Sequence, residues 1–547
     1  MQKAIEAVMS DKQAVVLVCQ GTGCASGGAE EVLRGLKAGA ENSDEDVLVK
    51  RTGCHGFCQQ GPLIVVEPDG FFYTKVKTED VPEIIRSLMH GGKPVKRLFY
   101  RDPLTGHPVP HYHEIPFYNR QDRTILKHCG SIDPEDIRDY LAIGGYEALR
   151  NTVLKMTPED VISEIKQSGL RGLGGAGFPT GRKWESCRNA QGGMKYVICN
   201  ADEGDPGAFQ DRSVMEGNPH SVIEGMIIAA YATGAQNGLI YVRAEYPLAV
   251  SRLKIAIEQA RDEGFLGAHI LDGDFGFDID IFQGAGAFVC GESTALVRSI
   301  EGKRGRPKPM PRARTTEVGL WNRPTLLNNV KTYANVPLII MNGAEWFSQK
   351  GSGKSKGTAV FSLTGKVVNC GLIEVPMGAS LKHIIYDIGG GVPGGKALKA
   401  VQTGGPSGGC LPAHLLDIPV DFDSLTKAGS IMGSGGLVVM DEDTCMVDVA
   451  RYFLDFNRRE SCGQCIPCRL GTRQMFEILD DITKGEGRPG DIDTLMSLSE
   501  AIKRSSICGL GKTVPNPVLT TLRYFRDEYE AHIHEKRCPA GVCDMTC

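Results

Sequence analysis

The chain has 547 residues and a formal net charge of −5, with 41% hydrophobic and 23% charged residues. This length predicts several domains with separate cores, and the near-neutral charge argues against nucleic-acid binding by counterion release. The sequence contains no apolar run of about 18 residues and no secretory leader, so we expect a cytoplasmic protein without a membrane span.

Cysteine and glycine are unusually frequent, with 18 and 68 copies. Disulfides are rare in cytoplasmic proteins, so clustered cysteines indicate metal or redox chemistry, whereas scattered ones serve as small buried hydrophobes. Glycine permits tight turns and close approach of the backbone to a ligand. The spacing of both residue types therefore carries the functional information.

The first 150 residues are expected to form a small domain and an arm. Residues 1–100 alternate apolar strand-like and helical patterns, which is typical of an α/β unit. Its strands and helices are expected at 14–18, 30–37, 61–66 and 82–89. Residues 101–150 are rich in proline, histidine and charge and are expected to be a connecting arm.

Four cysteines in this first unit have the spacing C-x4-C and C-x3-C. They lie in the glycine-rich turns CQGTGC and CHGFC, each expected to follow an apolar strand. Thiolate pairs on two such loops can hold an iron–sulfur cluster, with zinc or a disulfide pair as the alternative. We predict a [2Fe–2S] cluster bound by Cys19, Cys24, Cys54 and Cys58.

Residues 151–350 alternate helical and strand patterns around glycine-rich turns, which predicts a layered α/β domain. The segment RGLGGAGFPTGRKW at 171–184 formally contains G-x-G-x-x-G. However, helical spacing precedes it and Pro179 follows, so the strand–loop–helix context of a dinucleotide fingerprint is absent. The segment can still form a phosphate cradle with Lys183 as a point charge, or it can be a structural turn.

Three later segments place acids and asparagines at expected strand ends. They are NADEGDPGAFQDR at 200–212, GAGAFVCGESTAL at 284–296 and NRPTLLNNVKT at 322–332. Such side chains suit the hydroxyls and ring edge of a flavin. With 171–184, these four ordered motifs closely resemble the flavin-binding subunit of respiratory complex I. They also resemble the diaphorase subunits of bidirectional or electron-bifurcating hydrogenases and formate dehydrogenases, and the resemblance covers nearly the whole chain.

The resemblance implies an FMN site and a nicotinamide nucleotide pocket. For FMN it implies Gly172, Gly174, Lys183, Asn200, Asp202, Glu203, Gly291, Glu292, Asn328, Asn329 and Thr332. For the nucleotide we expect contacts from Phe178, Asp205, Phe288, Ser293, Arg312 and Arg314, with core packing as the alternative for the two phenylalanines.

Ser293 bears on the choice of nucleotide. In complex I a second glutamate follows the motif glutamate, whereas here Ser293 follows Glu292. An acidic side chain near the adenosine ribose repels a 2′-phosphate, and arginine attracts it. Ser293 with Arg312 or Arg314 therefore favours NADP(H) slightly, and a solvated basic loop is the alternative.

The next region is expected to hold a linker and a compact module. GSGKSKG at 351–357 predicts a flexible linker, and the β-type runs that follow predict an α+β module. Residues 351–435 resemble the β-grasp module of the same family. GGPSGGC at 404–410 is expected to form turns rather than a phosphate loop, because it contains Pro406 and no lysine.

A second cysteine cluster lies in the C-terminal part, residues 436–530, where the pattern is mainly helical. SCGQCIPC at 461–468 has the spacing C-x2-C-x2-C, and a single distant cysteine follows in SICGLGK. Zinc sites more often use two C-x2-C pairs, so this arrangement favours a [4Fe–4S] cluster. Its ligands are expected to be Cys462, Cys465, Cys468 and Cys508, in what the resemblance implies is a four-helix domain.

The tail at 531–547 is expected to bind zinc through Cys445, His532, Cys538 and Cys543, as its resemblance to the hydrogenase branch implies. His534 is the rival ligand to His532, and a set of free thiols is the alternative. Longer relatives continue into a ferredoxin module with two further [4Fe–4S] clusters, which we expect to be absent here. The unpaired cysteines are expected to be structural, with lining of the flavin pocket as the alternative for Cys290; they are Cys129, Cys187, Cys199, Cys290, Cys370 and Cys410.

These features predict an NAD(P)H:acceptor oxidoreductase subunit in which FMN takes a hydride and passes single electrons to the [4Fe–4S] cluster. We expect a small thioredoxin-like [2Fe–2S] partner and a large iron–sulfur partner, a hydrogenase or a formate dehydrogenase. With ferredoxin as a further partner, electron bifurcation is a hypothesis. The alternative function is an electron-relay scaffold without nucleotide binding, because Ser293 and Ser186 depart from the family pattern.

Overall fold

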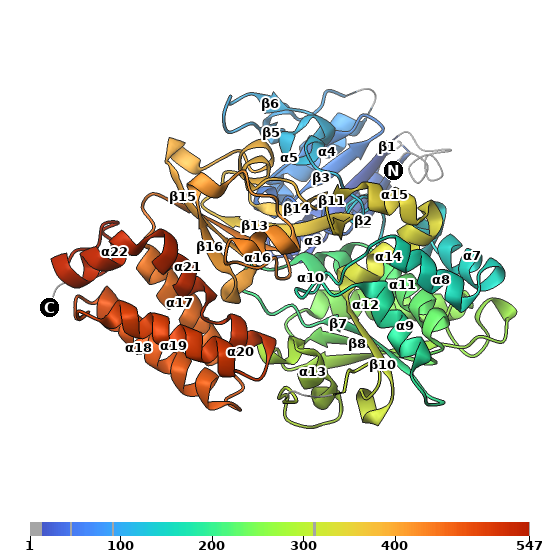
Figure 1. Cartoon of the computed structure of the whole chain (residues 1–547). Coiled ribbons are helices and arrows are strands. Elements are labelled where there is room, and N and C mark those ends of the chain that lie inside the picture. The colour runs from blue at the N-terminus through green and yellow to red at the C-terminus, as the bar shows by residue number, and fades with distance from the viewer. Residues whose placement is uncertain (1–13, 44–45, 90–91, 310–312, 546–547) are drawn as a thin grey trace.

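The structure is a computed structural model that describes residues 14–43, 46–89, 92–309 and 313–545. The chain forms an N-terminal sheet unit, a central parallel α/β unit, a mixed-sheet module and a C-terminal helical bundle, which confirms the expected multidomain α/β and α+β class. Figure 1 shows the bundle in red at the opposite end of the molecule from much of the green central unit. The mixed-sheet module, in orange, lies between the bundle and the blue N-terminal unit.

The N-terminal unit has a four-stranded sheet in the order β2-β1-β3-β4. The strands are β1 (Ala14–Cys19), β2 (Val47–Thr52), β3 (Ile64–Glu67) and β4 (Phe71–Tyr73), and the main helices are α3 (Ala29–Glu41) and α4 (Val81–Leu88). The sequence analysis did not predict β2, because its sequence VLVKRT carries charge and its residues are mostly half-buried. The strand expected at 61–66 begins only at Ile64, because Gly61 ends the turn after the second cysteine loop.

The segment 101–150 is more than an arm, because it carries α5 (Pro116–Asn119), α6 (Ile137–Ala142) and the start of α7 (Glu147–Lys155). A buried carboxylate ties it to the mixed sheet. Glu374 accepts the backbone N–H groups of Thr124, Ile125 and Leu126 at 2.8, 3.1 and 3.0 Å. These bonds fix the segment between the N-terminal unit and the rest of the chain.

The central unit contains a fully parallel sheet in the order β10-β7-β8-β9. Its strands are β7 (Tyr196–Ala201), β8 (Asn237–Arg243), β9 (Asp278–Gly284) and β10 (Thr325–Asn329). Its helices include α8 (Pro158–Gln167), α9 (Thr180–Asn189), α10 (Gln210–Gly217), α11 (Pro219–Thr233), α12 (Pro247–Asp262), α13 (Ser293–Ile300), α14 (Val330–Asn342) and α15 (Ala344–Gln349). The chain runs from β7 outward to β8 and β9 and then returns to the other side of β7. Ligands of open α/β sheets bind at the carboxyl ends of strands beside such a switch point, here between β7 and β10.

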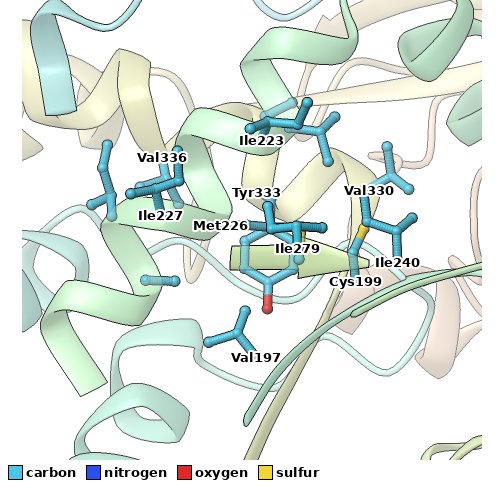
Figure 2. Packing of buried hydrophobic residues seen from close by; sticks show 14 of the residues in the cluster. Val197, Cys199, Ile223, Met226, Ile227, Ile240, Ile279, Val330, Tyr333 and Val336 are labelled. Atoms are coloured by element: carbon cyan, nitrogen blue, oxygen red, sulfur yellow. The ribbon is translucent and has the colours of Figure 1, made fainter. Parts of the chain in front are cut away.

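The core of the central unit lies where α11 and α14 cover this sheet. Both helices are buried nearly all round, and their side chains pack against residues of β7 and β8 (Figure 2). Tyr333 on α14 reaches the sheet, where its hydroxyl donates to the Ile198 carbonyl at 3.1 Å. An apolar layer of this kind holds the strand ends in fixed positions for the site.

The mixed-sheet module has five strands in the order β14-β13-β17-β15-β16. They are β13 (Thr358–Gly365), β14 (Gly371–Pro376), β15 (Leu398–Thr403), β16 (Gly409–Pro412) and β17 (Gly436–Asp441), with α16 (Phe422–Lys427) between the last two. The last strand lies beyond the boundary expected at residue 435. The prediction of a flexible linker at 351–357 was wrong. The strands β11 (Gly351–Ser352) and β12 (Ser355–Lys356) pair there as a tight hairpin, and Ser355 is buried.

The C-terminal part is helical, as expected. Its main helices are α17 (Met446–Arg459), α18 (Thr472–Thr483), α19 (Asp491–Ser505) and α21 (Asn516–Tyr524), with the shorter α20 (Gly509–Thr513) and α22 (Arg526–Glu530). They pack around one apolar cluster. Within the described ranges, no helix is long and apolar enough to cross a membrane.

Candidate functional site: a flavin-type pocket with three sets of metal ligands

A cavity of about 870 Å³ opens at the switch point of the parallel sheet. It falls within the roughly 300–1,000 Å³ of small-molecule sites. The four sequence motifs meet there, because each contributes lining residues. From the expected FMN set the lining includes Gly172, Gly174, Lys183, Asn200, Asp202, Glu203, Gly291, Glu292, Asn328 and Asn329.

The glycine loop at 171–178 lies directly against the end of β10. A Cβ atom on Gly174 would lie 2.9 Å from the Cβ of Asn329, so a side chain there would push the loop away from the strand. Thr332 supports this loop from behind, since its hydroxyl accepts the Leu173 N–H at 3.0 Å and the residue is fully buried. Of the expected FMN residues, Thr332 is therefore a support of the loop, not part of the cavity lining.

Lys183 supplies a positive charge deep in the pocket. Its Nζ donates to the Leu327 carbonyl at 2.9 Å, and burial lowers the pKa of the amine to about 8. An anionic ligand group such as a phosphate would stabilise the charged form. The loop and Lys183 together therefore form a cradle suited to an anion.

Two carboxyl groups that follow β7 have different surroundings. Asp202 is buried and neither of its oxygens has a hydrogen-bond partner among the described residues, and burial raises its pKa to about 7. Glu203 instead accepts the backbone N–H groups of Asp211 and Arg212 at 3.0 and 3.1 Å, at the start of α10. Its pKa is also raised to about 7 by burial. A ligand with hydroxyl groups would satisfy the unpartnered Asp202 carboxylate, which fits the ribityl chain of FMN.

Further polar residues of the cavity lining include Asn200, Asn328 and, in the segment 284–296, Glu292. Asn200 donates to the Gly291 carbonyl at 2.9 Å and thereby joins β7 to the loop before α13. With the Asn328 amide turned so that its O and N exchange places, it accepts the Trp184 indole N–H at 2.9 Å and donates to the Leu327 carbonyl at 3.1 Å. Glu292 caps α13 by accepting the N–H groups of Thr294 and Ala295 at 3.0 and 3.1 Å.

The expected nucleotide residues are only partly brought together. Phe178, Asp205, Phe288 and Ser293 line the cavity, and Phe178 is 44% exposed at its mouth. Arg314 is not among the lining residues. Arg312 lies outside the described residues.

One wall of the cavity was not foreseen from the sequence. It comes from the mixed-sheet module, through Gly404 and Ser407, the helix α16, and the segment 431–434. Gly433 forms a bridge with Gly175 of the glycine loop, so the module closes directly onto the loop. The glycine run at 404–410, expected as turns, was the available signal, and the structure does place a tight turn at Gly405–Ser407.

A buried ion pair lies at the cavity lining, and the sequence analysis did not predict it. Lys331 Nζ lies 2.6 Å from Asp211 Oδ1, and both side chains are at most 3% exposed. The other Asp211 oxygen accepts from the Asn329 amide at 2.5 Å. Lys331 lies inside the NNVKT motif, yet nothing in the local pattern indicates its distant partner.

The N-terminal cysteines are brought together by two interlocked turns. Cys54 Sγ and Cys58 Sγ lie 3.8 Å apart. A Cβ on Gly21 would lie 2.8 Å from that of Cys54, and a Cβ on Gly61 would lie 2.6 Å from Cys24 Sγ. Only glycine therefore lets the two cysteine loops approach closely, which fits four thiolates around a small cluster.

The C-terminal cysteines converge between α17, α18 and α20. Burial, with smaller contributions from Cys465, Cys508 and Cys462, raises the pKa of the Cys468 thiol to about 11. Gly509 and Leu510, directly after Cys508, line the large cavity. These four thiols therefore lie beside the flavin-type pocket. Such crowded thiols favour a bound cationic cluster, because four free thiolates would repel one another.

A third set of ligands forms where the C-terminal segment meets α17. The ligand atoms of Cys445, His532, Cys538 and Cys543 all lie within 4.8 Å of one another. The Sγ atoms of Cys445 and Cys543 are 3.6 Å apart, close to the ~3.8 Å expected for tetrahedral zinc with Zn–S bonds of about 2.3 Å. His532 Nδ1 donates to the Glu528 carbonyl at 2.7 Å, which leaves Nε2 facing the thiols. His534 points elsewhere and pairs with Glu530 at 3.0 Å.

The other described cysteines do not form a ligand set of this kind. Cys129, Cys187, Cys199, Cys290 and Cys410 are buried. Cys370 is half-buried at the edge of β14. Cys290 packs in an apolar cluster behind the cavity and is not part of its lining.

Comparison with known proteins matches each part of this arrangement. Residues 165–338 match the Nuo51 FMN-binding domain, residues 448–532 match the NADH-ubiquinone oxidoreductase-F iron–sulfur binding region, and residues 8–89 match the thioredoxin-like [2Fe-2S] ferredoxin family.

Curated relatives and solved structures extend the match to nearly the whole chain. The chain is 58% identical over 424 residues to the NADP-reducing hydrogenase subunit HndC of Solidesulfovibrio fructosivorans, covering 78% of this chain and 86% of that protein. It is 44% identical to an NADH-quinone oxidoreductase subunit of Rhizobium meliloti, over 76% and 98% of the two chains. A chain of the air-oxidised NAD+-reducing [NiFe]-hydrogenase matches with a TM-score of 0.66 and 29% identity, over 96% of this chain and 85% of that one.

An FMN-binding domain joined to [2Fe–2S] and [4Fe–4S] modules defines a flavin- and iron–sulfur-dependent oxidoreductase subunit. The sequence identity to the curated relatives, and the share of each chain that is covered, assign this chain to a narrower family. It belongs to the family of FMN-binding subunits that contains the hydrogenase protein HndC and the corresponding subunits of NADH-quinone oxidoreductases.

Proposed function

We propose that this subunit transfers a hydride between a nicotinamide nucleotide and FMN and passes the electrons on singly through the [4Fe–4S] cluster. The observation that supports this most directly is the position of Gly509 and Leu510. They line the flavin-type cavity and follow the cluster cysteine Cys508 without interruption. A pocket and a cluster that share one short segment are suited to electron transfer between them.

The FMN site proposed from the structure uses the residues of the cavity. The glycine loop with Lys183 would hold the phosphate, and Asp202 would accept hydrogen bonds from ribityl hydroxyls. Glu203 keeps α10 in place, and Thr332 keeps the glycine loop in place. FMN bound there supplies the hydride and single-electron chemistry, so no general acid or base of the chain is required.

The nucleotide would enter at the mouth of the same cavity. Phe178 and Phe288 offer aromatic surfaces in the cavity lining, and Ser293 begins the helix α13. Because Ser293 carries no negative charge, a 2′-phosphate is not repelled at that position, which supports NADP(H) as a substrate beside NADH. The name of the relative HndC, an NADP-reducing hydrogenase subunit, is consistent with this proposal.

The experiment for nucleotide choice is anaerobic flavin reduction by NADH and by NADPH in the wild type and in Ser293→Glu. We expect the substitution to lower the rate with NADPH about tenfold relative to NADH, since one charged contact is worth ~1.5–3 kcal/mol. A wild type at least tenfold better with NADH, with a ratio that the substitution leaves unchanged, would exclude the role of Ser293.

We further propose the cluster ligands and a zinc site. Cys19, Cys24, Cys54 and Cys58 would hold the [2Fe–2S] cluster, and Cys462, Cys465, Cys468 and Cys508 the [4Fe–4S] cluster. Zinc would bind to Cys445, His532, Cys538 and Cys543, whose ligand atoms lie together and whose histidine is oriented by a backbone carbonyl. Zinc there would join the segment 538–543 to the start of α17.

The subunit would act in a larger cytoplasmic complex. We propose a large iron–sulfur partner of the hydrogenase type, because the relatives include a hydrogenase subunit and a hydrogenase structure. A formate dehydrogenase in that place, a separate small thioredoxin-like [2Fe–2S] subunit and a ferredoxin with electron bifurcation are further proposals. Co-purification from the native host tests them, and recovery of this chain as a lone active homo-oligomer would contradict them.

The second candidate function is a relay that keeps flavin and clusters but does not bind nucleotide. The observation that favours it is that Arg314, the one described residue of the expected basic pair, is not among the residues that line the cavity. A flavin that neither NADH nor NADPH bleaches would support the relay.

A further inference from the structure

The loop that carries Phe288 is held by the cluster-bearing part of the chain. The backbone N–H of Phe288 donates to Glu460 Oε2 at 3.0 Å, and 172 residues separate the two in sequence. Glu460 follows the last residue of α17 and stands two positions before the cluster cysteine Cys462. A hydrogen bond to a carboxylate is among the stronger kinds in proteins.

The Phe288 ring has two contacts with distant parts of the chain. It lies on Gly204, where an added Cβ would come within 2.5 Å of the ring. It also meets Phe456 of α17, with ring centroids 5.5 Å apart in an edge-to-face arrangement. One contact therefore belongs to the flavin motif that follows β7, and the other belongs to the helix that leads to the [4Fe–4S] cysteines.

The same loop is fastened to the flavin site by an arginine. Arg243 donates from Nη1 to the Glu203 carbonyl at 2.8 Å and from Nη2 to the Gly286 carbonyl at 3.0 Å. The loop is thus linked through Arg243 to the pocket and through Glu460 to the bundle. Cys462 itself packs against the apolar cluster that contains Val289.

We propose that Glu460 and Phe456 are positioning residues that hold Phe288 in place for the nicotinamide nucleotide, so that nucleotide affinity depends on how the cluster-bearing helix is placed. This inference rests on the proposed function, in which Phe288 lines the nucleotide side of the cavity. Without the Glu460 acceptor the Phe288 N–H loses its partner, the loop relaxes, and the ring loses its contacts with Gly204 and Phe456.

The test measures binding of NAD+ and NADP+ to the oxidised holoenzyme by calorimetry, together with KM and kcat for flavin reduction. Glu460→Ala should weaken binding of the preferred nucleotide and raise its KM about tenfold, with kcat within about twofold of wild type. Glu460→Gln keeps an acceptor oxygen and should bind within about twofold of wild type. Phe456→Leu removes the aromatic contact and should weaken binding about threefold.

Two further measurements separate positioning from a general structural role. The [4Fe–4S] signal of the dithionite-reduced protein and the flavin content should be unchanged in all three variants. Glu477→Ala is the matched control, since Glu477 lies on α18 of the same bundle, is 47% exposed and pairs only with Arg473 among the contacts described. It should bind nucleotide like the wild type.

Three outcomes overturn the proposal. They are wild-type affinity in Glu460→Ala, an equal loss in Glu460→Gln, and a loss of affinity that is matched by a loss of the cluster signal. If the wild type itself binds neither nucleotide, the proposed function fails first and this inference fails with it. That result is obtained before any variant is made, so the two failures are distinguishable.

Discussion

Replacing Lys331 by methionine should weaken the flavin site through the ion pair beneath it. Lys331 Nζ lies 2.6 Å from Asp211 Oδ1, and both side chains are at most 3% exposed. The Asp211 carboxylate also accepts a hydrogen bond from the Asn329 amide. Methionine fills a similar volume but leaves the Asp211 carboxylate with only the amide as a partner. Breaking a buried pair in this way costs about 3–5 kcal/mol. We therefore expect a large loss of local stability next to the cavity.

The assay is release of bound flavin during urea unfolding, followed by its fluorescence. At an m value of about 2 kcal/mol/M, the loss corresponds to a midpoint lower by about 2 M. Lys331→Met combined with Asp211→Asn removes the unpaired charge and should recover most of that loss. Lys354→Met, at the exposed turn between β11 and β12, is the control and should leave the midpoint unchanged. A Lys331→Met midpoint within about 0.5 M of wild type, or a double variant as unstable as the single one, would refute the reasoning.

Three further predictions concern the cofactors and the buried acid. The protein purified anaerobically should hold one flavin, about six irons and one zinc, and ten or more irons would mean a missed cluster. Cys465→Ala should remove the [4Fe–4S] signal and leave about two irons with the [2Fe–2S] signal intact. Cys543→Ser should release the zinc without changing either cluster signal, and retention of a full equivalent of zinc would argue against the ligand set. Because burial raises the pKa of Asp202 to about 7, above its unfolded value, its ionisation costs stability increasingly as pH rises from about 4 to about 7. Flavin-free wild type should therefore lose more thermal stability between about pH 5.5 and pH 8 than Asp202→Asn does, and equal losses would contradict the role of Asp202.

Local spacing grouped the cysteines of the two expected iron–sulfur sets, whereas the thioredoxin-like and β-grasp assignments and the zinc set came from the family resemblance. Short-range patterns such as C-x2-C-x2-C fix which cysteines lie on one turn, and the structure brings the distant Cys508 to them. The sequence analysis chose His532 and kept His534 as its rival, and the structure places His532 Nε2 beside Cys445 Sγ and His534 beside Glu530. A short helical turn sends one toward the thiols and the other toward Glu530.

Contacts between distant segments were beyond the sequence. The wall formed by the mixed-sheet module, the Lys331–Asp211 pair and the bond from Phe288 to Glu460 each join residues more than 100 positions apart. No periodicity in a short window encodes such pairs. The linker prediction at 351–357 failed for a related reason, since glycine and serine there serve a paired hairpin rather than a free segment.

The most direct test of the account is anaerobic titration of the purified protein with NADH and with NADPH, while flavin absorbance and the [4Fe–4S] signal are recorded together. We expect at least one nucleotide to bleach the flavin and the cluster signal to appear in the same titration, because Cys508 and the cavity share the segment 508–510. A flavin that dithionite reduces, but that neither NADH nor NADPH reduces, would contradict the proposed function. That result would favour the alternative function, an electron relay without nucleotide binding.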